Sequence, residues 1–373
     1  MSEAAHALLG ASSSHRWLVC PGSVLLTKDM PDTTSEYAEE GTLAHVVCEA
    51  IARWNLQGGA QEIPEQATDE MIDCAGLYVE TIMAAAAELG ESPYIALEQR
   101  VDYSRWVPDG FGTADCVIIG GNTLHVLDYK HGKGVRVEAE DNPQLKLYAL
   151  GALDRYSLLY DISVVRWSIV QPRNGGVSHA EPVLKESLLN WAEDIVRPAA
   201  LLALTPNAPM NPGEGCRFCK AKGSCKARSD YYLALEGFEQ KDSRLLAPDQ
   251  LGDILKRGKD LAKWLADLEE HALSQLLAGS NIPGWKAVEG RSVRNWADAE
   301  AAFRKAIELG IPEEMLYERK PITLSQLEKT MGKKGFAPMT EFVTIPSGKP
   351  ALAPESDKRP AITSRPSAEQ DFA

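Results

Sequence analysis

The sequence predicts an α/β fold: a mixed central sheet flanked by helices, followed by a mainly α-helical C-terminal region. Residues 36–204 alternate amphipathic helical segments with short apolar, β-branched runs, in the order helices, three strands, helix, strand, helix. Residues 226–277 carry an almost continuous helical pattern. The hydrophobic content of 44% is normal for a globular protein.

The individual elements follow from local pattern. We expect a short helix near residues 23–28 and longer helices at 36–55, 68–90, after Pro143 and at 184–204. We expect strands at 94–101, 113–119, 123–130 and 162–172. Beyond residue 277, the sequence predicts a small strand-like insert at 282–296 and short helices at 297–309 and 323–331. The resulting prediction is one domain over 1–230 and a mainly helical one over 231–346. The Pro-, Ser- and charge-rich residues 347–373 are predicted to form a disordered tail.

Composition limits the classes of function. The chain has 373 residues and a net charge of −14, which excludes a protein that coats nucleic acid through bulk charge but allows a local basic groove. It has no apolar run long enough for a transmembrane helix, and its N-terminus lacks the pattern of a secretory signal. We therefore expect a cytoplasmic protein that does not bind membranes.

Two carboxylates stand out within a buried hairpin. If Gly121 and Asn122 form a two-residue loop, residue 120 pairs with 123 and Asp115 lies opposite Asp128. Carboxylates placed side by side repel each other, and a divalent cation such as Mg²⁺ removes that repulsion. Lys130 can then orient a water or stabilise charge on a phosphate. The alternative is an ordinary hairpin in which the aspartate and lysine side chains form a salt bridge.

A second motif consists of cysteines. Cys216, Cys219 and Cys225 form C-x2-C-x5-C, and Cys20 lies far upstream. Disulfides are rare in the cytosol, so four thiolates converging on one centre indicate either a [4Fe–4S] cluster or structural Zn²⁺. The spacing does not distinguish the two. The other three cysteines, Cys48, Cys74 and Cys116, lie in apolar surroundings and are interpreted as core residues.

One arrangement in the sequence resembles the motif of the PD-(D/E)xK nuclease superfamily. It consists of Asp115, a spacer of 12 residues and then Asp128-Tyr129-Lys130. The first motif departs from the pattern, since "GTAD" lacks the proline. Three further features resemble RecB-like nucleases, in particular the CRISPR-associated iron–sulfur exonuclease branch. These features are "EEGTLAHVVCE" with His45, "NPQLKLYALG" with Gln144 and Tyr148, and the four cysteines. The resemblance covers residues 12–226.

This resemblance implies a restriction-endonuclease-like core and a role for each motif residue. It implies that Mg²⁺ or Mn²⁺ is held by His45, Asp115, Asp128 and the backbone carbonyl of Tyr129. It assigns Lys130 to the attacking water and Gln144 and Tyr148 to support of the substrate and the lysine. Glu98 falls where such folds carry an acidic residue on the preceding strand. For the cysteines, the resemblance favours [4Fe–4S] over zinc.

The implied function is a metal-dependent DNA nuclease, with exonuclease as the favoured mode, in phage DNA replication or recombination. The C-terminal stretches "GWKAVEGRSVRNW" and "GKPALAPESDKRP" resemble an uncharacterised phage and prophage family of RecB-like proteins. The expected partners are single- or double-stranded DNA, a phage single-strand-binding or recombination protein, and a second copy of the chain. One alternative is a non-catalytic DNA-binding or assembly protein on a nuclease fold. Another is a protein stabilised by a structural zinc ion, in which the D-x-K match is accidental.

Overall fold

The computed structural model describes residues 7–31, 36–58, 62–233, 248–288, 298–308, 311–312, 316 and 323–343. The chain divides into two compact units, residues 1–288 and 289–373, which are described separately. The predicted tail at 347–373 lies outside the described residues. No helix in the described part of the chain is both long and apolar enough to cross a bilayer.

The first unit is built on a mixed sheet of six strands. They are β1 (Tyr94–Asp102), β2 (Phe111–Gly120), β3 (Thr123–Tyr129), β4 (Val164–Gln171), β5 (Gly176–His179) and β6 (Val183–Leu184). The strand order is β1-β2-β3-β4-β5, and β6 pairs with β4. The β3–β4 pair is parallel, whereas the other pairs are antiparallel. A parallel pair needs a long crossover, and α5 (Pro143–Tyr156) supplies it.

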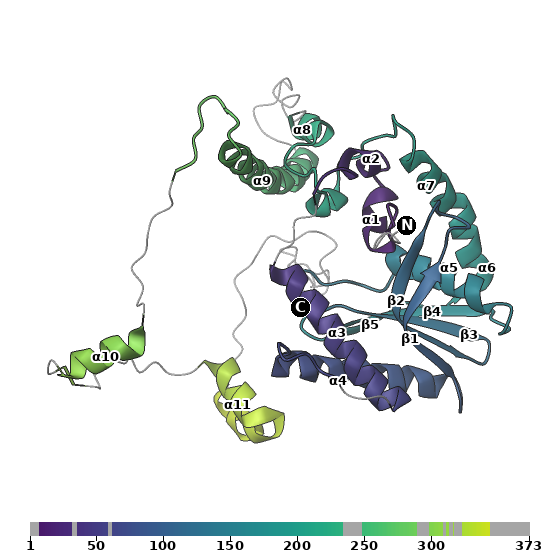
Figure 1. Ribbon diagram of the computed structural model, residues 1–373, viewed down its shortest axis with the longest axis horizontal. Coiled ribbons are helices and arrows are strands. Elements are labelled where there is room, and N and C mark those ends of the chain that lie inside the picture. The colour runs from purple at the N-terminus through teal and green to yellow at the C-terminus, as the bar shows by residue number, and fades with distance from the viewer. Residues whose placement is uncertain are drawn as a thin grey trace, which may run out of the picture. The chain divides into compact units, whose positions relative to one another are not determined.

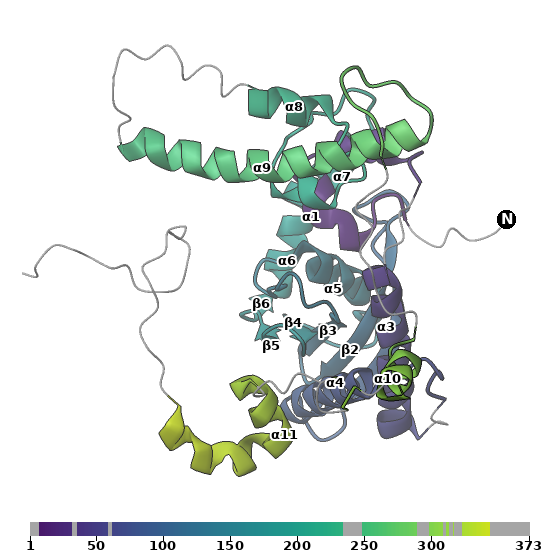
Figure 2. The ribbon, with the colours of Figure 1, turned by 90° about the vertical axis from the view of Figure 1, so that its left-hand side faces the viewer.

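Helices cover both faces of this sheet (Figures 1 and 2). One face is covered by α3 (Glu36–Gln57) and α4 (Asp69–Glu88). The other is covered by α5, α6 (Lys185–Trp191) and α7 (Arg197–Ala203), with an N-terminal segment that includes α1 (Ser14–Trp17) and α2 (Ser23–Thr27). A π-helical turn, Ala192–Val196, joins α6 to α7.

The central strands are apolar on both faces because each face is buried. Val117 and Val126 face the cluster that includes α5, whereas Cys116 and Leu127 face the cluster formed with α3 and α4. This explains why β2 and β3 read as continuous apolar runs in the sequence. A polar residue near the end of either strand therefore needs a specific partner.

Two helices complete the first unit. They are α8 (Lys226–Leu233) and the long α9 (Pro248–Leu277). Their contact includes stacking of Tyr232 on Trp264, with ring centroids 5.5 Å apart, and an ion pair of 2.6 Å between Arg228 and Asp267. The second unit contains α10 (Ala299–Glu308), α11 (Leu324–Phe336) and a 3₁₀ helix at Ala337–Phe342.

The predicted fold class is confirmed at the level of a mixed α/β sheet flanked by helices, with a helical C-terminal region. The sequence pattern did not predict β5 and β6, which are only four and two residues long. The predicted strand-like insert at 282–296 is wrong for residues 282–288, which form a turn and no strand. Its remaining residues lie outside the described part of the chain.

Candidate metal centre and cysteine cluster

The β2–β3 hairpin has the predicted register. Gly120 pairs with Thr123, and the pairing continues to Cys116 and Leu127. The next residues along the two strands are Asp115 and Asp128, which are 9% and 2% exposed. Oδ2 of Asp115 accepts a hydrogen bond of 2.7 Å from the backbone N–H of Tyr129, which fixes this carboxylate against β3.

Glu98 on β1 faces the same aspartate from the other side. The β1–β2 pairing runs from Leu97–Cys116 to Gln99–Ala114, which sets Glu98 opposite Asp115 without a regular ladder pair. Its φ of 49° lies in the left-handed region, which is unusual for a non-glycine residue within a strand. Such strained backbone is concentrated at functional sites.

His45 on α3 completes a group of three potential ligands. Its Nδ1 lies 3.5 Å from Oδ2 of Asp115. One ligand atom from each of His45, Glu98 and Asp115 lies within 4.8 Å of the others, and no other such group of three or more occurs among the described residues. Three separate elements, α3, β1 and β2, thus present one nitrogen and two carboxylates to a common point.

The electrostatics show how costly this arrangement is without a cation. Burial and then the Asp128 carboxylate raise the pKa of Asp115 to about 6. Burial and then Asp115 raise the pKa of Glu98 to about 8. Burial and a neighbouring carboxylate therefore disfavour the charged form of each of these two groups, and a cation bound between them would favour it.

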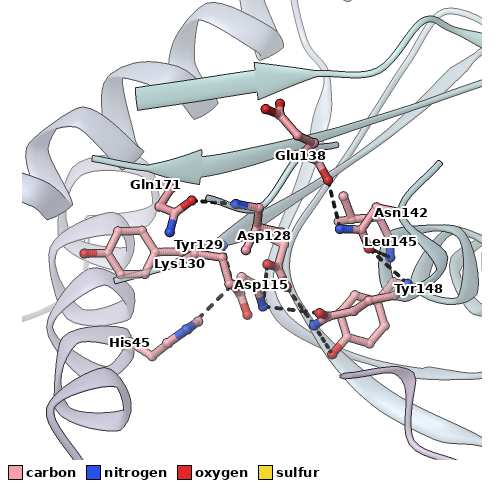
Figure 3. Close-up of polar contacts among 12 residues, drawn as sticks. His45, Asp115, Asp128, Tyr129, Lys130, Glu138, Asn142, Leu145, Tyr148 and Gln171 are labelled. Carbon is pink, nitrogen blue, oxygen red and sulfur yellow. Dashed lines mark hydrogen bonds and ion pairs between the residues drawn. The ribbon is translucent and has the colours of Figure 1, made fainter. Parts of the chain in front are cut away.

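Asp128 belongs to a second, adjoining network (Figure 3). Its Oδ2 lies 2.8 Å from Nζ of Lys130, and its Oδ1 accepts a hydrogen bond of 3.1 Å from Nε2 of Gln144. The same Nε2 donates a hydrogen bond of 3.2 Å to the hydroxyl of Tyr148. The side-chain carbonyl of Gln144 accepts a hydrogen bond of 3.3 Å from Nζ of Lys130. Burial lowers the pKa of Lys130, but the Asp128 and Asp115 carboxylates outweigh this and raise it above its ordinary value. Of the residues predicted from the sequence, Asp128, Lys130, Gln144 and Tyr148 thus form one connected set.

Tyr129 lies between the two groups. Its backbone N–H holds Asp115, whereas its ring is fully buried against the His45 and Tyr78 rings. Its hydroxyl lies 2.8 Å from Nδ1 of His131. The metal role predicted for its carbonyl stays a prediction.

Two residues that position the site were not identified from the sequence. Asn142 caps α5 by accepting hydrogen bonds from the backbone N–H groups of Gln144 and Leu145. The sequence signal was available, because asparagine before proline is a typical helix start. Gln171 on β4 (Figure 3) accepts a hydrogen bond from the N–H of Val137. It also donates to carbonyl groups of the loop that follows Lys130, and these contacts between distant residues leave no local pattern in the sequence.

Arg173 holds α3, and with it His45, in place. Its side chain is 9% exposed and lies 2.8 Å from Oε1 of Glu40 on α3 and 3.5 Å from Oε1 of Glu70 on α4. These ion pairs join the loop after β4 to both helices that cover this face. The sequence did not predict a role for Arg173 either, because its partners are about 100 residues or more away along the chain.

The four predicted cysteines come together. Cys20, Cys216, Cys219 and Cys225 line one small cavity of about 20 Å³, and all are free thiols. The backbone N–H of Asn211 donates to Sγ of Cys20 at 3.2 Å, and that of Gly213 donates to Sγ of Cys216 at 3.4 Å. The N-terminal segment is thereby joined to the loop before α8. The other three cysteines are buried in the core, as predicted.

A neighbouring set of ion pairs fastens the cysteine loop to α9. Lys222 lies 3.0 Å from Asp267, which also pairs with the buried Arg228. Gly223 approaches α9 so closely that an added Cβ would lie 2.6 Å from the carbonyl oxygen of Asp267. These two basic side chains are therefore engaged by α9.

Comparison with known proteins places the chain in a family. A solved structure titled "Crystal structure of SSO0001" is 17% identical over 61% of this chain and 90% of that chain, with a TM-score of 0.26. A family model described as "Protein of unknown function (DUF2800)" matches residues 6–360, which is nearly the whole chain. The chain therefore belongs to the DUF2800 family.

Proposed function

We propose that this protein is a metal-dependent DNA nuclease with a restriction-endonuclease-like, RecB-like core, acting in phage DNA replication or recombination in the bacterial cytoplasm. The observation that carries the proposal is the convergence of His45, Glu98 and Asp115 beside the Asp128–Lys130 pair. Carboxylates and a lysine on adjacent strands, with an imidazole from α3, are groups that can hold a divalent metal and orient a water for phosphodiester hydrolysis. Exonuclease is the favoured mode.

The donor set fits a divalent cation. Its two carboxylates and one imidazole suit Mg²⁺ or Mn²⁺, which keep several waters and bind substrate phosphate oxygens. Asp128 and the carbonyl of Tyr129 are the further ligands that we propose. When bound, the metal would polarise the phosphate and lower the pKa of a coordinated water.

The neighbouring side chains supply orientation. Nζ of Lys130, held by Asp128 and Gln144, is a donor placed to hydrogen-bond a water or a phosphate oxygen. Gln144 and Tyr148 lie one helical turn apart on α5 and hold the side chains of Asp128 and Lys130 in position. Their proposed roles are those of positioning residues.

We propose that the cysteine cavity holds an iron–sulfur cluster rather than zinc. Tetrahedral zinc at its usual bond length places sulfurs about 3.8 Å apart. Within the described part of the chain, no three cysteine sulfurs lie within 4.8 Å of one another. Four thiolates that line one cavity are a ligand set for a [4Fe–4S] centre, for which we propose a structural role.

The proposed partner is DNA, single- or double-stranded. An acidic chain needs help to hold a polyanion, so we also propose contact with a phage single-strand-binding or recombination protein or with a second copy of the chain. Lys222 and Arg228 are engaged in ion pairs with Asp267. We therefore propose that other surfaces of the protein contact the DNA.

The test is cleavage of end-labelled linear DNA by anaerobically purified protein with Mg²⁺ or Mn²⁺. We expect cleavage by the native chain, its loss in Lys130→Met and Asp128→Asn, and its retention in Lys185→Met at the start of α6. The label also reports polarity. A folded, brown, DNA-binding protein that never cleaves would instead establish the non-catalytic role. Equal cleavage by Lys130→Met and the native chain would refute the proposed site.

A further inference from the structure

An exposed arginine lies on β1 beside the candidate metal centre. Arg100 is two residues beyond Glu98, and its partner in the β1–β2 register is Thr113. Thr113 in turn lies two residues before Asp115 on β2, and both Arg100 and Thr113 are exposed. Two residues of strand span about 7 Å. The long side chain of Arg100 is therefore within reach of a substrate bound at the metal centre.

The alternation of side chains along the strands places Arg100 on the face that carries the metal centre. Val101 and Ala114 belong to the core cluster on the α5 side of the sheet. Neighbouring residues of a strand point to opposite faces, so Arg100 and Thr113 point to the other side. That side is covered by α3, which supplies His45. The guanidinium and the potential metal ligands thus lie on the same side of the sheet.

An aromatic ring orients this guanidinium. Cζ of Arg100 lies over the ring of Phe111 on β2, 4.3 Å from its centroid. Such a contact uses the face of the planar guanidinium and leaves the N–H donors in its plane available. Among the described residues, Arg100 forms no ion pair with a carboxylate. The carboxylate of Asp102, the next residue on this side of β1, instead accepts a hydrogen bond of 2.8 Å from the N–H of Ser104.

Two other cations close to the metal centre are engaged by carboxylates. Nζ of Lys130 lies 2.8 Å from Oδ2 of Asp128. Arg53 lies about two turns after His45 on α3, and its Nε lies 2.8 Å from Oε1 of Glu49. Since the chain carries a net charge of −14, a phosphate that approaches this site needs a cation with uncommitted donors. The exposed arginine on β1 provides one.

We propose that Arg100 binds the DNA phosphate next to the one that is hydrolysed. This inference rests on the proposed nuclease function and adds a substrate-binding residue to it. A guanidinium presents two parallel N–H donors that match the oxygens of a phosphate. The hydroxyl of Thr113, paired with Arg100 across the strands, is a further donor on the same exposed surface. Contacts to phosphate carry no sequence information, so this one would position a strand of any sequence.

The first test is DNA binding by the full chain, with Ca²⁺ in place of Mg²⁺ and intact DNA verified on a gel. The probe is a fluorescein-labelled oligonucleotide, used as a single strand and as a duplex, and the readout is fluorescence anisotropy at several salt concentrations. We expect Arg100→Gln to raise Kd about five- to tenfold. We also expect it to lower the slope of log Kd against log salt by about one, because one phosphate contact is lost.

Two further variants separate this contact from general charge. Arg155→Gln is the matched control, because Arg155 is also exposed and also lies over an aromatic ring, that of Tyr156. It lies about three turns along α5 from Gln144, and its loss should leave Kd and the salt slope unchanged. Arg100→Lys keeps the charge but loses the planar pair of donors, so its Kd should lie between those of the native chain and Arg100→Gln.

Cleavage kinetics with Mg²⁺ distinguish a failure of this inference from a failure of the proposed nuclease. We expect Arg100→Gln to raise KM while kcat stays within about threefold of the native value, because the contact binds substrate and transition state alike. A native chain that cleaves DNA, with Kd, KM and salt slope unchanged in Arg100→Gln, would overturn the role of Arg100 alone. Equal weakening by Arg155→Gln would also overturn it. A native chain that neither binds nor cleaves DNA would overturn both proposals.

Discussion

Oδ1 of Asp128 accepts a hydrogen bond of 3.1 Å from Nε2 of Gln144, whose carbonyl accepts from Lys130 at 3.3 Å. One side chain on α5 thus restrains both residues of the D-x-K motif. We expect Gln144→Met to lower nuclease activity about 10- to 100-fold, as is typical when a supporting shell is lost. The measurement is cleavage rate at saturating metal, with Gln57→Met on α3 as the control. Unchanged activity would mean that the amide has no positioning role.

Glu98 is expected to be a metal ligand because it faces Asp115 across β1 and β2. Glu98→Gln should raise the Kd for Mn²⁺ about tenfold, because affinity depends on the charge of the ligand set. Isothermal titration of Mn²⁺ measures this directly. Glu49→Gln, which removes a nearby carboxylate paired with Arg53, is the control. Equal affinity of the native and Glu98→Gln proteins would exclude Glu98 from the site.

The ring of Tyr148 lies directly over Gly112. A Cβ added at Gly112 would lie 2.7 Å from Cε1 of Tyr148, so Gly112→Ala must displace the ring from Gln144. We expect a loss of about 1–3 kcal/mol in the free energy of unfolding, as for other overpacked cores. Denaturant unfolding measures it. Gly41→Ala on α3, where an added Cβ meets nothing within 4 Å, should instead be neutral or slightly stabilising.

The cysteine cavity joins the N-terminal segment to the loop before α8. We expect Cys219→Ser to abolish the brown colour and the bound iron and to lower the unfolding temperature, because a bound centre contributes its binding energy to folding. Iron and zinc analysis with visible absorption is the measurement. Cys74→Ala, in the separate core set, should keep the colour. A colourless native protein containing zinc would favour the alternative in which the cysteines hold structural zinc.

His125 makes stability depend on pH. Burial, and then Arg166, lowers its pKa from 6.5 to about 3. Between these values the unfolded chain binds a proton that the folded chain does not. Stability is therefore lost as pH falls below 6.5, by up to about 1.4 kcal/mol per pH unit. Denaturant unfolding from pH 7 to 4 should show a shallower loss in His125→Asn than in the native protein. Identical slopes would rule out this origin.

The sequence by itself determined the order of the elements and the pairing of the hairpin. Apolar runs and a Gly-Asn loop were enough to set Asp115 opposite Asp128, because a two-residue loop leaves only one register that buries both strands. Helix periodicity was enough to bound α3, α4 and α5 to within a few residues. The short β5 and β6 were missed because four and two residues carry too little pattern.

Only the tertiary structure decided which side chains share a site. The metal set implied by the resemblance was His45, Asp115, Asp128 and the carbonyl of Tyr129, with Glu98 as an acidic residue on the preceding strand. In the folded chain, Glu98 lies beside His45 and Asp115. The Asp128 carboxylate is instead held by Lys130 and Gln144. That division depends on a left-handed backbone at Glu98 and on how α3 is held by Arg173, both of which arise from contacts distant in sequence. Local pattern sets the direction of a side chain along its own strand, but packing between elements sets the distances on which a metal site depends.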